Sequence, residues 1–218
     1  MRQAKDYIVF PLDVSSSDEA KSYVELLADH VGLFKVGYEL MIRSGPDIVR
    51  FINTAGGAGV FLDLKLHDIP ATVSRAMAGI VDLDIRFATV HCGETPKMLE
   101  AAVGASQGRV QILGVTVLTS MTDQDLQELG YTESATQRVL RLAAMSAASG
   151  LDGVVCSPLE VGPLRAQRGG EFRIVEAELD RRRQEPERGA GVETALLRDD
   201  GVHLAAGPLQ EAVRVFFA

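Results

Sequence analysis

Residues 60–70 read Val-Phe-Leu-Asp-Leu-Lys-Leu-His-Asp-Ile-Pro, and a helical pattern of apolar residues follows over residues 72–81. The stretch begins with an apolar run and ends in charged residues, which is typical of a buried strand whose carboxyl end meets solvent. A strand of this kind with a helix behind it predicts one β/α unit of a parallel sheet.

The same alternation of a short apolar run and a helical pattern recurs on both sides of this unit. The predicted strands are 7–12, 33–36, 60–64, 87–91, 110–117, 153–156, 172–175 and, with the weakest pattern, 202–206. The predicted helices are 17–30, capped by Ser17, and 46–53, 72–81, 96–106, 135–149 and 158–167. Seven or eight such units in 218 residues favour a closed (β/α)₈ barrel of the TIM type over an open sheet. No linker divides the chain, so residues 1–218 are predicted to form a single α/β domain.

The composition limits the classes of function. A net charge of −8 gives no general support for nucleic-acid binding, so an anionic substrate would need its positive charge supplied locally. Cys92 and Cys156 form no metal-binding pattern and are predicted to be buried thiols. The apolar stretch 7–12 is too short for the core of a signal peptide, and no apolar run is long enough to span a membrane. We therefore expect a cytoplasmic protein with no membrane segment.

Charged residues stand where the predicted strands end. Asp13 follows the first strand, Lys35 lies near the end of the second, and Asp63, Lys65 and Asp68 surround the end of the third. In a parallel barrel the active-site groups lie at the carboxyl ends of the strands. Asp63 and Lys65 are two residues apart and share one face of their strand. Lys35 on the neighbouring strand could extend them into an alternating array of Lys, Asp, Lys and Asp.

Several chemistries fit such an array, and a buried salt-bridge network without catalysis is the plainest of them. A lysine could form a Schiff base, but flanking carboxylates should keep Lys65 charged and suit it better to donate a proton. The carboxylates could instead bind a divalent ion with His67 or His91. A lysine between the carboxylates would occupy the place of that ion, and His91 is more typical of a strand-end histidine held by hydrogen bonds.

The stretch from Asp63 to Thr72, Asp-Leu-Lys-Leu-His-Asp-Ile-Pro-Ala-Thr, resembles the signature of the orotidine 5′-phosphate decarboxylase family. Further similar segments follow the order of that family: Leu-Asp at 12–13, Phe-Lys-Val-Gly at 34–37, Val-Thr-Val-Leu-Thr-Ser-Met at 115–121 and Gly-Leu-Asp-Gly-Val-Val-Cys-Ser at 150–157. The resemblance extends over about residues 7–175. It implies decarboxylation of orotidine 5′-phosphate to uridine 5′-phosphate and carbon dioxide in pyrimidine synthesis, with no metal and no organic cofactor.

The resemblance also implies roles for single residues. Lys65 would protonate C6 of the pyrimidine, and Asp63 would lie beside the departing carboxylate. Lys35 and Asp13 would contact the ribose. Asp68 would reach the site of a partner subunit, which implies a homodimer with shared active sites. The other residues expected at the substrate are Thr72, which would also reach the partner's site, Ile69, Pro70, Thr119 and Ser120, the last two against the base, and Gly207.

Residues 176–218 depart from the pattern of the family. The family grips the substrate phosphate with a Thr-Pro-Gly-Ile-Arg-Pro loop after strand seven and a Gly-Arg-Pro sequence at the end of strand eight. Here Glu176, Glu178 and Asp180 stand at the first place, and Gly207 is followed by proline without the arginine. The three arginines at 181–183 could substitute. Either this tail is divergent, or it comes from a shifted reading frame or a misassigned sequence, and a chain with this tail is expected to bind the nucleotide phosphate weakly.

Two other functions compete with decarboxylation of the nucleotide. One is a magnesium-dependent sugar-phosphate decarboxylase or aldolase of the same barrel group, which the Ile69-Pro70 and Leu-Thr-Ser (118–120) segments argue against. The other is a binding or scaffold relative that has lost catalysis. The presence of Asp63, Lys65 and Asp68 argues against that reading, whereas the atypical tail argues for it.

Overall fold

The computed structural model of the protein describes residues 3–170, 172–176 and 213–216. Its strands form a closed barrel in the order β1 to β8, as the sequence predicts for a TIM-type fold. The strands are β1 (Ile8–Pro11), β2 (Leu33–Gly37), β3 (Gly59–Leu66), β4 (Phe87–His91), β5 (Gln111–Val115), β6 (Gly153–Cys156), β7 (Arg173–Glu176) and β8 (Val213–Phe216). Strands β1 to β7 pair in parallel, each with the next.

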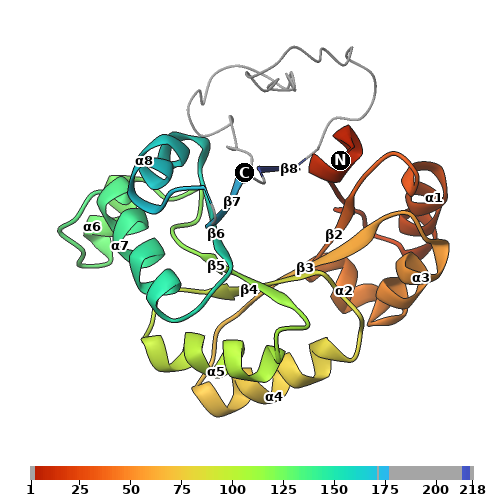
Figure 1. Ribbon diagram of the computed structural model, residues 1–218, viewed down its shortest axis with the longest axis horizontal. Helices are drawn as coiled ribbons and strands as arrows, with labels where there is room; N and C mark the ends of the chain where they lie inside the picture. The colour runs from red at the N-terminus through yellow and green to blue at the C-terminus, as the bar shows by residue number, and fades with distance from the viewer. Residues whose placement is uncertain (1–2, 171, 177–212, 217–218) are drawn as a thin grey trace.

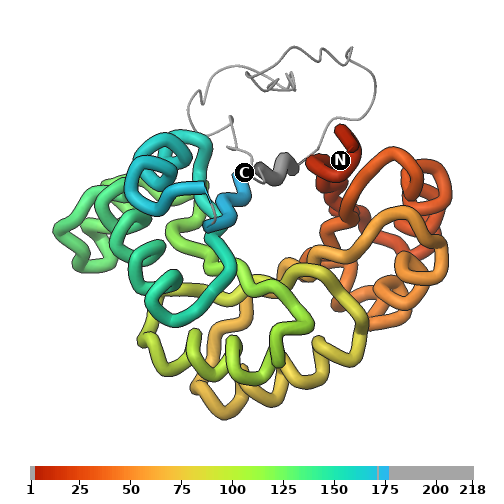
Figure 2. The backbone as a smooth tube through the Cα atoms, in the orientation of Figure 1, coloured from red at the N-terminus to blue at the C-terminus, as the bar shows by residue number. Residues whose placement is uncertain are grey.

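Helices surround the described part of the barrel on its outside (Figure 1). After a 3₁₀ turn, Ala4–Tyr7, they are α1 (Ser17–Leu27), α2 (Tyr38–Ser44), α3 (Asp47–Ala55), α4 (Pro70–Val81), α5 (Pro96–Ser106), α6 (Asp123–Glu128), α7 (Ala135–Ala148) and α8 (Pro158–Arg168). Figure 2 shows the described backbone running around a central axis, from the N-terminal turn to the end of β7. Helices α4 and α5 lie between the group α1 to α3 and the group α6 to α8 (Figure 1).

The sequence predicts most of these elements but misses two short helices. The α2 and α6 helices are too short to show a clear apolar periodicity, and no helix was predicted over residues 38–44 or 123–128. The predicted cap at Ser17 is wrong by one residue: Ser16 is the N-cap, and its hydroxyl accepts a hydrogen bond from the Glu19 amide at 3.2 Å. A serine in extended conformation immediately before the helix satisfies one of its free amides.

The eighth strand differs from the expected one. The predicted strand 202–206 lies outside the described residues, and β8 pairs antiparallel with both β1 and β7 instead of continuing the parallel order. An antiparallel strand offers the same backbone donors and acceptors, so it satisfies the two edges that seven parallel strands leave open. The single-domain prediction for residues 1–218 stays a prediction, because residues 177–212 are not among those described.

The barrel has an inner and an outer apolar layer, because each parallel strand is covered on both faces. The inner layer consists of Val9, Leu33, Phe61, Phe87, Leu113 and Val175, with Val155 packed against it. The outer layer packs residues of alternate parity against the helices, among them Phe34, Leu62, Ala88 and Ile112. Alternation along the strands therefore fixes which residues point into the barrel and which point at the helices.

The two cysteines are buried and form no disulfide, which confirms the prediction of buried thiols. Burial raises the pKa of both the Cys92 and the Cys156 thiol to about 12. None of the helices in the described residues has the length and apolar character needed to cross a membrane.

Candidate active site

A polar layer lies above the inner apolar layer, at the carboxyl ends of β2 to β4. Lys35, Asp63 and Thr89 each follow a residue of the apolar layer by two positions and so point to the same inner face. Lys65 follows Asp63 by two, and His91 follows Thr89 by two. The strand alternation thus brings Lys35, Asp63 and Lys65, which the sequence predicts to be functional, to one end of the barrel together with Thr89 and His91.

Asp63 and Lys65 form an ion pair at this end of β3. The Lys65 Nζ lies 2.7 Å from Asp63 Oδ2, and the two side chains are 30% and 15% exposed respectively. The Lys65 backbone has a φ of 46°, in the left-handed region that residues with a Cβ enter at a cost of about 1–2 kcal/mol. The pairing of β3 with β4 shifts its register between Leu62 and Leu66, so the strand is irregular around Lys65. Backbone strain of this kind persists where the surroundings hold it, and it concentrates at functional sites.

Thr89 on β4 connects both members of this pair. Its Oγ1 accepts a hydrogen bond from the Lys65 amide at 2.8 Å and donates one to Asp63 Oδ1 at 2.9 Å. The side chain is only 1% exposed. Thr89 was not among the site residues predicted from the sequence. The available signal was a hydroxyl at an inward position of the strand Phe-Ala-Thr-Val-His, where the neighbouring residues are apolar.

A second ion pair joins β1 and β2. The Lys35 Nζ donates to both oxygens of Asp13, at 2.8 and 3.2 Å, and Asp13 is 47% exposed. The predicted alternating array is therefore not formed within one chain, because Lys35 pairs with Asp13 rather than with Asp63. Asp13, which follows β1, lies close enough to Lys35 on the neighbouring strand to form an ion pair with it. The spacing of residues along either strand does not predict this contact between strands.

Asp68 and its neighbours lie on the loop between β3 and α4. Asp68 Oδ1 accepts a hydrogen bond from the Ile69 amide at 2.6 Å, and among the residues that the structure describes no cation lies within ion-pair distance of this carboxylate. Ile69 is 65% exposed. Pro70 begins α4, where its missing amide hydrogen is not needed, and the Thr72 amide donates to the Ile69 carbonyl at 3.0 Å. The chain leaves this loop exposed beside its own charged pairs.

Two histidines stack beside the Asp63–Lys65 pair. The His67 and His91 rings lie 5.2 Å apart at 25°, and His67 Nε2 lies 3.2 Å from Glu94 Oε1. The Gly93 amide donates to His91 Nδ1 at 3.3 Å, as expected for a strand-end histidine held by a hydrogen bond. Burial lowers the pKa of His91, and the positive charges of His67 and Lys65 lower it further. Within the part of the chain that the structure describes, no three His, Cys, Asp or Glu side chains gather in a way that could hold a metal ion.

The residues expected to contact the base lie farther from their strand than predicted. Strand β5 ends at Val115 instead of residue 117, and Thr119 and Ser120 belong to a turn beyond it. The chain leaves the ladder at Thr116, whose hydroxyl donates to the Val155 carbonyl at 2.9 Å. Both turn residues are half-buried and lie in the loop between β5 and α6.

The expected phosphate-binding end of the barrel is described only as far as Glu176. Val175 belongs to the inner layer, and Glu176 is paired in register with Cys156, which packs in the outer layer. Glu176 therefore points at the helices, and the expectation that it stands in the mouth of the barrel is wrong because the strand alternation turns it away. The other residues predicted for this end, Glu178, Asp180, Arg181, Arg182, Arg183 and Gly207, lie outside the described residues.

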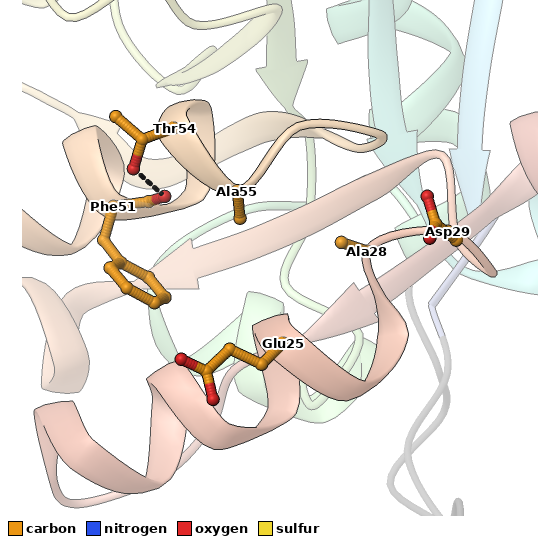
Figure 3. Close-up of a pocket in the computed structure, with 6 residues that line it drawn as sticks. All are labelled: Glu25, Ala28, Asp29, Phe51, Thr54 and Ala55. Atoms are coloured by element: carbon orange, nitrogen blue, oxygen red, sulfur yellow. Dashed lines mark hydrogen bonds between the residues drawn. The ribbon is translucent and has the colours of Figure 1, made fainter.

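A hollow of about 420 Å³ lies elsewhere, on the outer surface between α1 and α3 (Figure 3). Its lining residues are Glu25, Ala28, Asp29, Phe51, Thr54 and Ala55. Ala28 and Asp29 precede β2 and Ala55 precedes β3, so the hollow lies toward the amino-terminal ends of these strands, and the Thr54 hydroxyl is already bonded to the Phe51 carbonyl at 2.8 Å. The chemistry of a parallel barrel takes place at the carboxyl ends of its strands, so the candidate active site is the charged mouth and not this hollow.

Comparisons with known proteins agree with the fold and the motifs. The model of the orotidine 5′-phosphate decarboxylase / HUMPS family matches residues 6–202. The chain is 49% identical over 176 residues to the orotidine 5′-phosphate decarboxylase of Desulfosudis oleivorans, covering 78% of this chain and 71% of that protein. It is 45% identical over 183 residues to the enzyme of the same name from Syntrophus aciditrophicus, covering 80% and 72%.

A solved structure gives the same result. The crystal structure of orotidine 5′-phosphate decarboxylase from Lactobacillus acidophilus superposes with a TM-score of 0.73 at 34% identity, over 78% of this chain and 80% of that one. An uncharacterized conserved protein from Geobacillus kaustophilus superposes with a TM-score of 0.72 at 35% identity, over 76% and 80%. With the fold, the charged strand ends and the matched residues in agreement, the chain belongs to the orotidine 5′-phosphate decarboxylase / HUMPS family.

Proposed function

We propose that the protein converts orotidine 5′-phosphate to uridine 5′-phosphate and carbon dioxide. The observation that carries this proposal is the Lys65 ammonium, held 2.7 Å from Asp63 at the carboxyl end of β3. Relatives that are up to 49% identical over most of the chain bear the name of this activity. The ion pair supplies a preformed positive charge at the place where a barrel enzyme carries out its chemistry.

The reaction needs such a charge because its intermediate has no internal stabilisation. As the bond between C6 and the carboxylate breaks, its electron pair stays on C6 in an orbital that the ring cannot delocalise. An ammonium aimed at C6 stabilises the developing carbanion without any rearrangement of solvent. A proton then moves from Lys65 Nζ to C6, and carbon dioxide leaves as the second product. The Asp63 carboxylate beside the substrate carboxylate would add repulsion that is relieved as the bond breaks.

The second ion pair and the loop after β5 would bind the rest of the nucleoside. Lys35 and Asp13 lie at the ends of the adjacent strands β2 and β1, at hydrogen-bonding distance from one another, which suits contacts to the ribose hydroxyls. Thr119 and Ser120 would contact the base from the turn after β5. Any phosphate contacts would come from beyond Glu176, with Gly207 among them, and they are expected to be weak.

We further propose a homodimer in which each subunit completes the active site of the other. Asp68 is exposed and has no cation within ion-pair distance among the described residues of its own chain, although it lies three residues from Lys65. Ile69, beside it, is 65% exposed, and Tyr38 and Ile42 on α2 are 52% and 80% exposed. Large exposed apolar side chains near a charged mouth suit a subunit interface, where Asp68 and Thr72 would meet the partner's substrate. Sedimentation equilibrium at micromolar concentration should give a dimer, and a monomer at all concentrations would contradict this proposal.

An ultraviolet assay of the purified protein with orotidine 5′-phosphate tests the activity directly. We expect loss of the substrate's absorbance with formation of uridine 5′-phosphate, and the same rate after treatment with a chelator. Turnover of a sugar phosphate that depends on added magnesium would instead support the aldolase or decarboxylase relatives of the same barrel group. A cytoplasmic location would accord with pyrimidine synthesis, and fractionation of the source cells would test it.

A further inference from the structure

We infer that Thr89 is a positioning residue, whose single hydroxyl fixes both the backbone of Lys65 and the carboxylate of Asp63. This inference rests on the proposed function, because it assigns Thr89 a part in aligning the proton donor. The hydroxyl acts both as donor and as acceptor: its hydrogen goes to Asp63 Oδ1 at 2.9 Å, and its oxygen accepts from the Lys65 amide at 2.8 Å. Each of these bonds has a direction, so the pair of bonds fixes two groups of β3 relative to β4.

The Lys65 amide needs an acceptor that the sheet does not provide. The β3–β4 pairing is regular at Phe61 and Leu62 and resumes at Leu66, so the residues between them lie outside the regular ladder. A bulged strand leaves backbone groups without a ladder partner, and a buried amide without an acceptor is costly. The Thr89 hydroxyl takes the place of that acceptor, and it does so for the residue whose φ of 46° is unfavourable for a side chain.

The same hydroxyl orients the carboxylate that holds the ammonium. Asp63 Oδ1 is bound by Thr89, and Asp63 Oδ2 is bound by Lys65 Nζ at 2.7 Å. With one partner on each oxygen, the carboxylate plane has little freedom to rotate. The Lys65 ammonium is therefore fixed in two ways, through its backbone amide bound to Thr89 and through its ion pair with Asp63. Catalysis depends on such placement, because a misplacement of about 1 Å can cost about a hundredfold in rate.

A purely structural role for Thr89 makes a different prediction, and Thr116 provides the matched comparison. Thr116 is also buried, 2% exposed, and its hydroxyl donates to the Val155 carbonyl at 2.9 Å. It follows β5, and neither Asp63 nor Lys65 is among its hydrogen-bond partners. If Thr89 only satisfied buried polar groups, Thr89→Val and Thr116→Val should affect stability and activity alike.

The test compares Thr89→Val, Thr89→Ser and Thr116→Val in the full-length protein, with kcat, KM and the melting temperature measured for each. Thr89→Val should lower kcat by about ten- to a hundredfold and leave KM within about threefold, because alignment is lost while the substrate contacts remain. Thr89→Ser keeps the hydroxyl and should restore kcat to within about fivefold of the native value. Thr116→Val should keep the native kcat. A Thr89→Val enzyme with native kcat, or an equal loss in Thr116→Val, would overturn the inference, and Thr89→Ala takes the place of Thr89→Val should the valine variant not fold.

A second measurement separates this inference from the proposed function. Hydrogen exchange of the Lys65 amide, followed by NMR, reports the Thr89 bond whether or not the protein turns over orotidine 5′-phosphate. We expect exchange at least about tenfold faster in Thr89→Val and near native in Thr89→Ser. If the native protein had no decarboxylase activity, the proposed function would fail while this result still supported Thr89 as the group that holds Lys65. Unchanged exchange in Thr89→Val would overturn the inference itself.

Discussion

The two sides of the barrel mouth differ sharply in chemistry. On the side formed by β1 to β4, the inward side chains make two carboxylate–lysine pairs, Asp13 with Lys35 and Asp63 with Lys65. On the side formed by β5 to β7, the inward positions above or within the apolar layer are Val115, Val155 and Val175. The same parallel architecture therefore supports a charged half and an apolar half.

The difference indicates that the two sides contribute differently to catalysis. Charges inside a barrel are tolerated only when paired, and each lysine on the charged side has a carboxylate within 2.8 Å. The valines opposite them exclude water, and a charge acts more strongly on a developing carbanion where the surroundings are apolar. We therefore expect the electronic work of catalysis to depend on the charged side, and the described part of the apolar side to contribute shape rather than charge.

The largest effect should follow from removing the proton donor on the charged side. Lys65→Ala leaves Asp63 and Thr89 in place but removes the ammonium, so decarboxylation should fall by at least about a hundredfold, the usual contribution of a single acid. The measurement is the ultraviolet assay at saturating substrate. Lys21→Ala on α1 is the matched control, because Lys21 is a half-exposed lysine away from the strand ends, and it should leave the rate unchanged.

Retention of more than about a hundredth of the native rate by Lys65→Ala would contradict the role of Lys65. Borohydride added with substrate provides a second check. We expect no covalent adduct, because a charged lysine paired with a carboxylate is a poor nucleophile for a Schiff base. A trapped adduct at Lys65 would assign the protein to a different reaction class.

The next largest effect should be a recovery of activity when two inactive variants are mixed, because Asp68 is expected to act in the active site of the partner subunit. Asp68→Asn and Lys65→Ala should each be inactive alone. Mixed after subunit exchange, they should regain about a quarter of the native activity, because half of the dimers are mixed and each of these has one site with both native residues. Mass spectrometry of differently labelled subunits provides the control for exchange. Demonstrated exchange without any recovery would show that Asp68 serves the site of its own chain.

The fold and the charged side could be predicted from the sequence for related reasons. Continuous apolar runs between helical patterns predict a parallel barrel, and strands 87–91 and 153–156 have the predicted bounds. Asp63 and Lys65 could be recognised because charged residues at the end of a buried strand are costly unless they are paired or functional. Their spacing of two places both side chains on one face of the strand. These features are local in sequence, so a single chain is sufficient to reveal them.

The remaining features depend on contacts between strands. The choice of Asp13 rather than Asp63 as the partner of Lys35 depends on where the loop after β1 turns. The hydroxyl of Thr89 accepts a hydrogen bond from the Lys65 amide because the register of β3 against β4 shifts there, and no pattern along either strand predicts this shift. Glu176 was expected in the mouth because the sequence does not show which of Val175 and Glu176 faces the inside of the barrel, and the pairing of Glu176 with Cys156 decides it.

A smaller effect should appear in the pH dependence of stability. Burial lowers the pKa of His91 below its ordinary value of 6.5, so the unfolded chain binds more protons than the folded one in the window below that value. The free energy of unfolding should therefore fall as the pH drops from about 7 through 6.5, until the folded protein also binds the proton. In His91→Asn this part of the decline should disappear, as measured by urea denaturation between pH 7 and 5. His30→Asn, at an exposed position after α1, is the control, and a decline equally steep in His91→Asn and the native protein would show that other groups cause it.

The smallest effect should be found on the apolar side, in the contribution of the phosphate to nucleotide binding. A phosphate dianion is usually held by backbone amides at a helix N-terminus and by a bidentate arginine. The inward residues at the described ends of β6 and β7 are Val155 and Val175, and Arg173 stands at the other end of β7, 3.9 Å from Asp152. Isothermal titration calorimetry should therefore show uridine 5′-phosphate binding no more than about threefold tighter than uridine, since a charge-assisted contact of 1.4 kcal/mol would already give about tenfold. Binding of uridine 5′-phosphate that is tighter by tenfold or more would contradict this prediction. It would mean that a cation beyond Glu176 contacts the phosphate, and the arginines at 181–183 would be the first candidates for substitution by alanine.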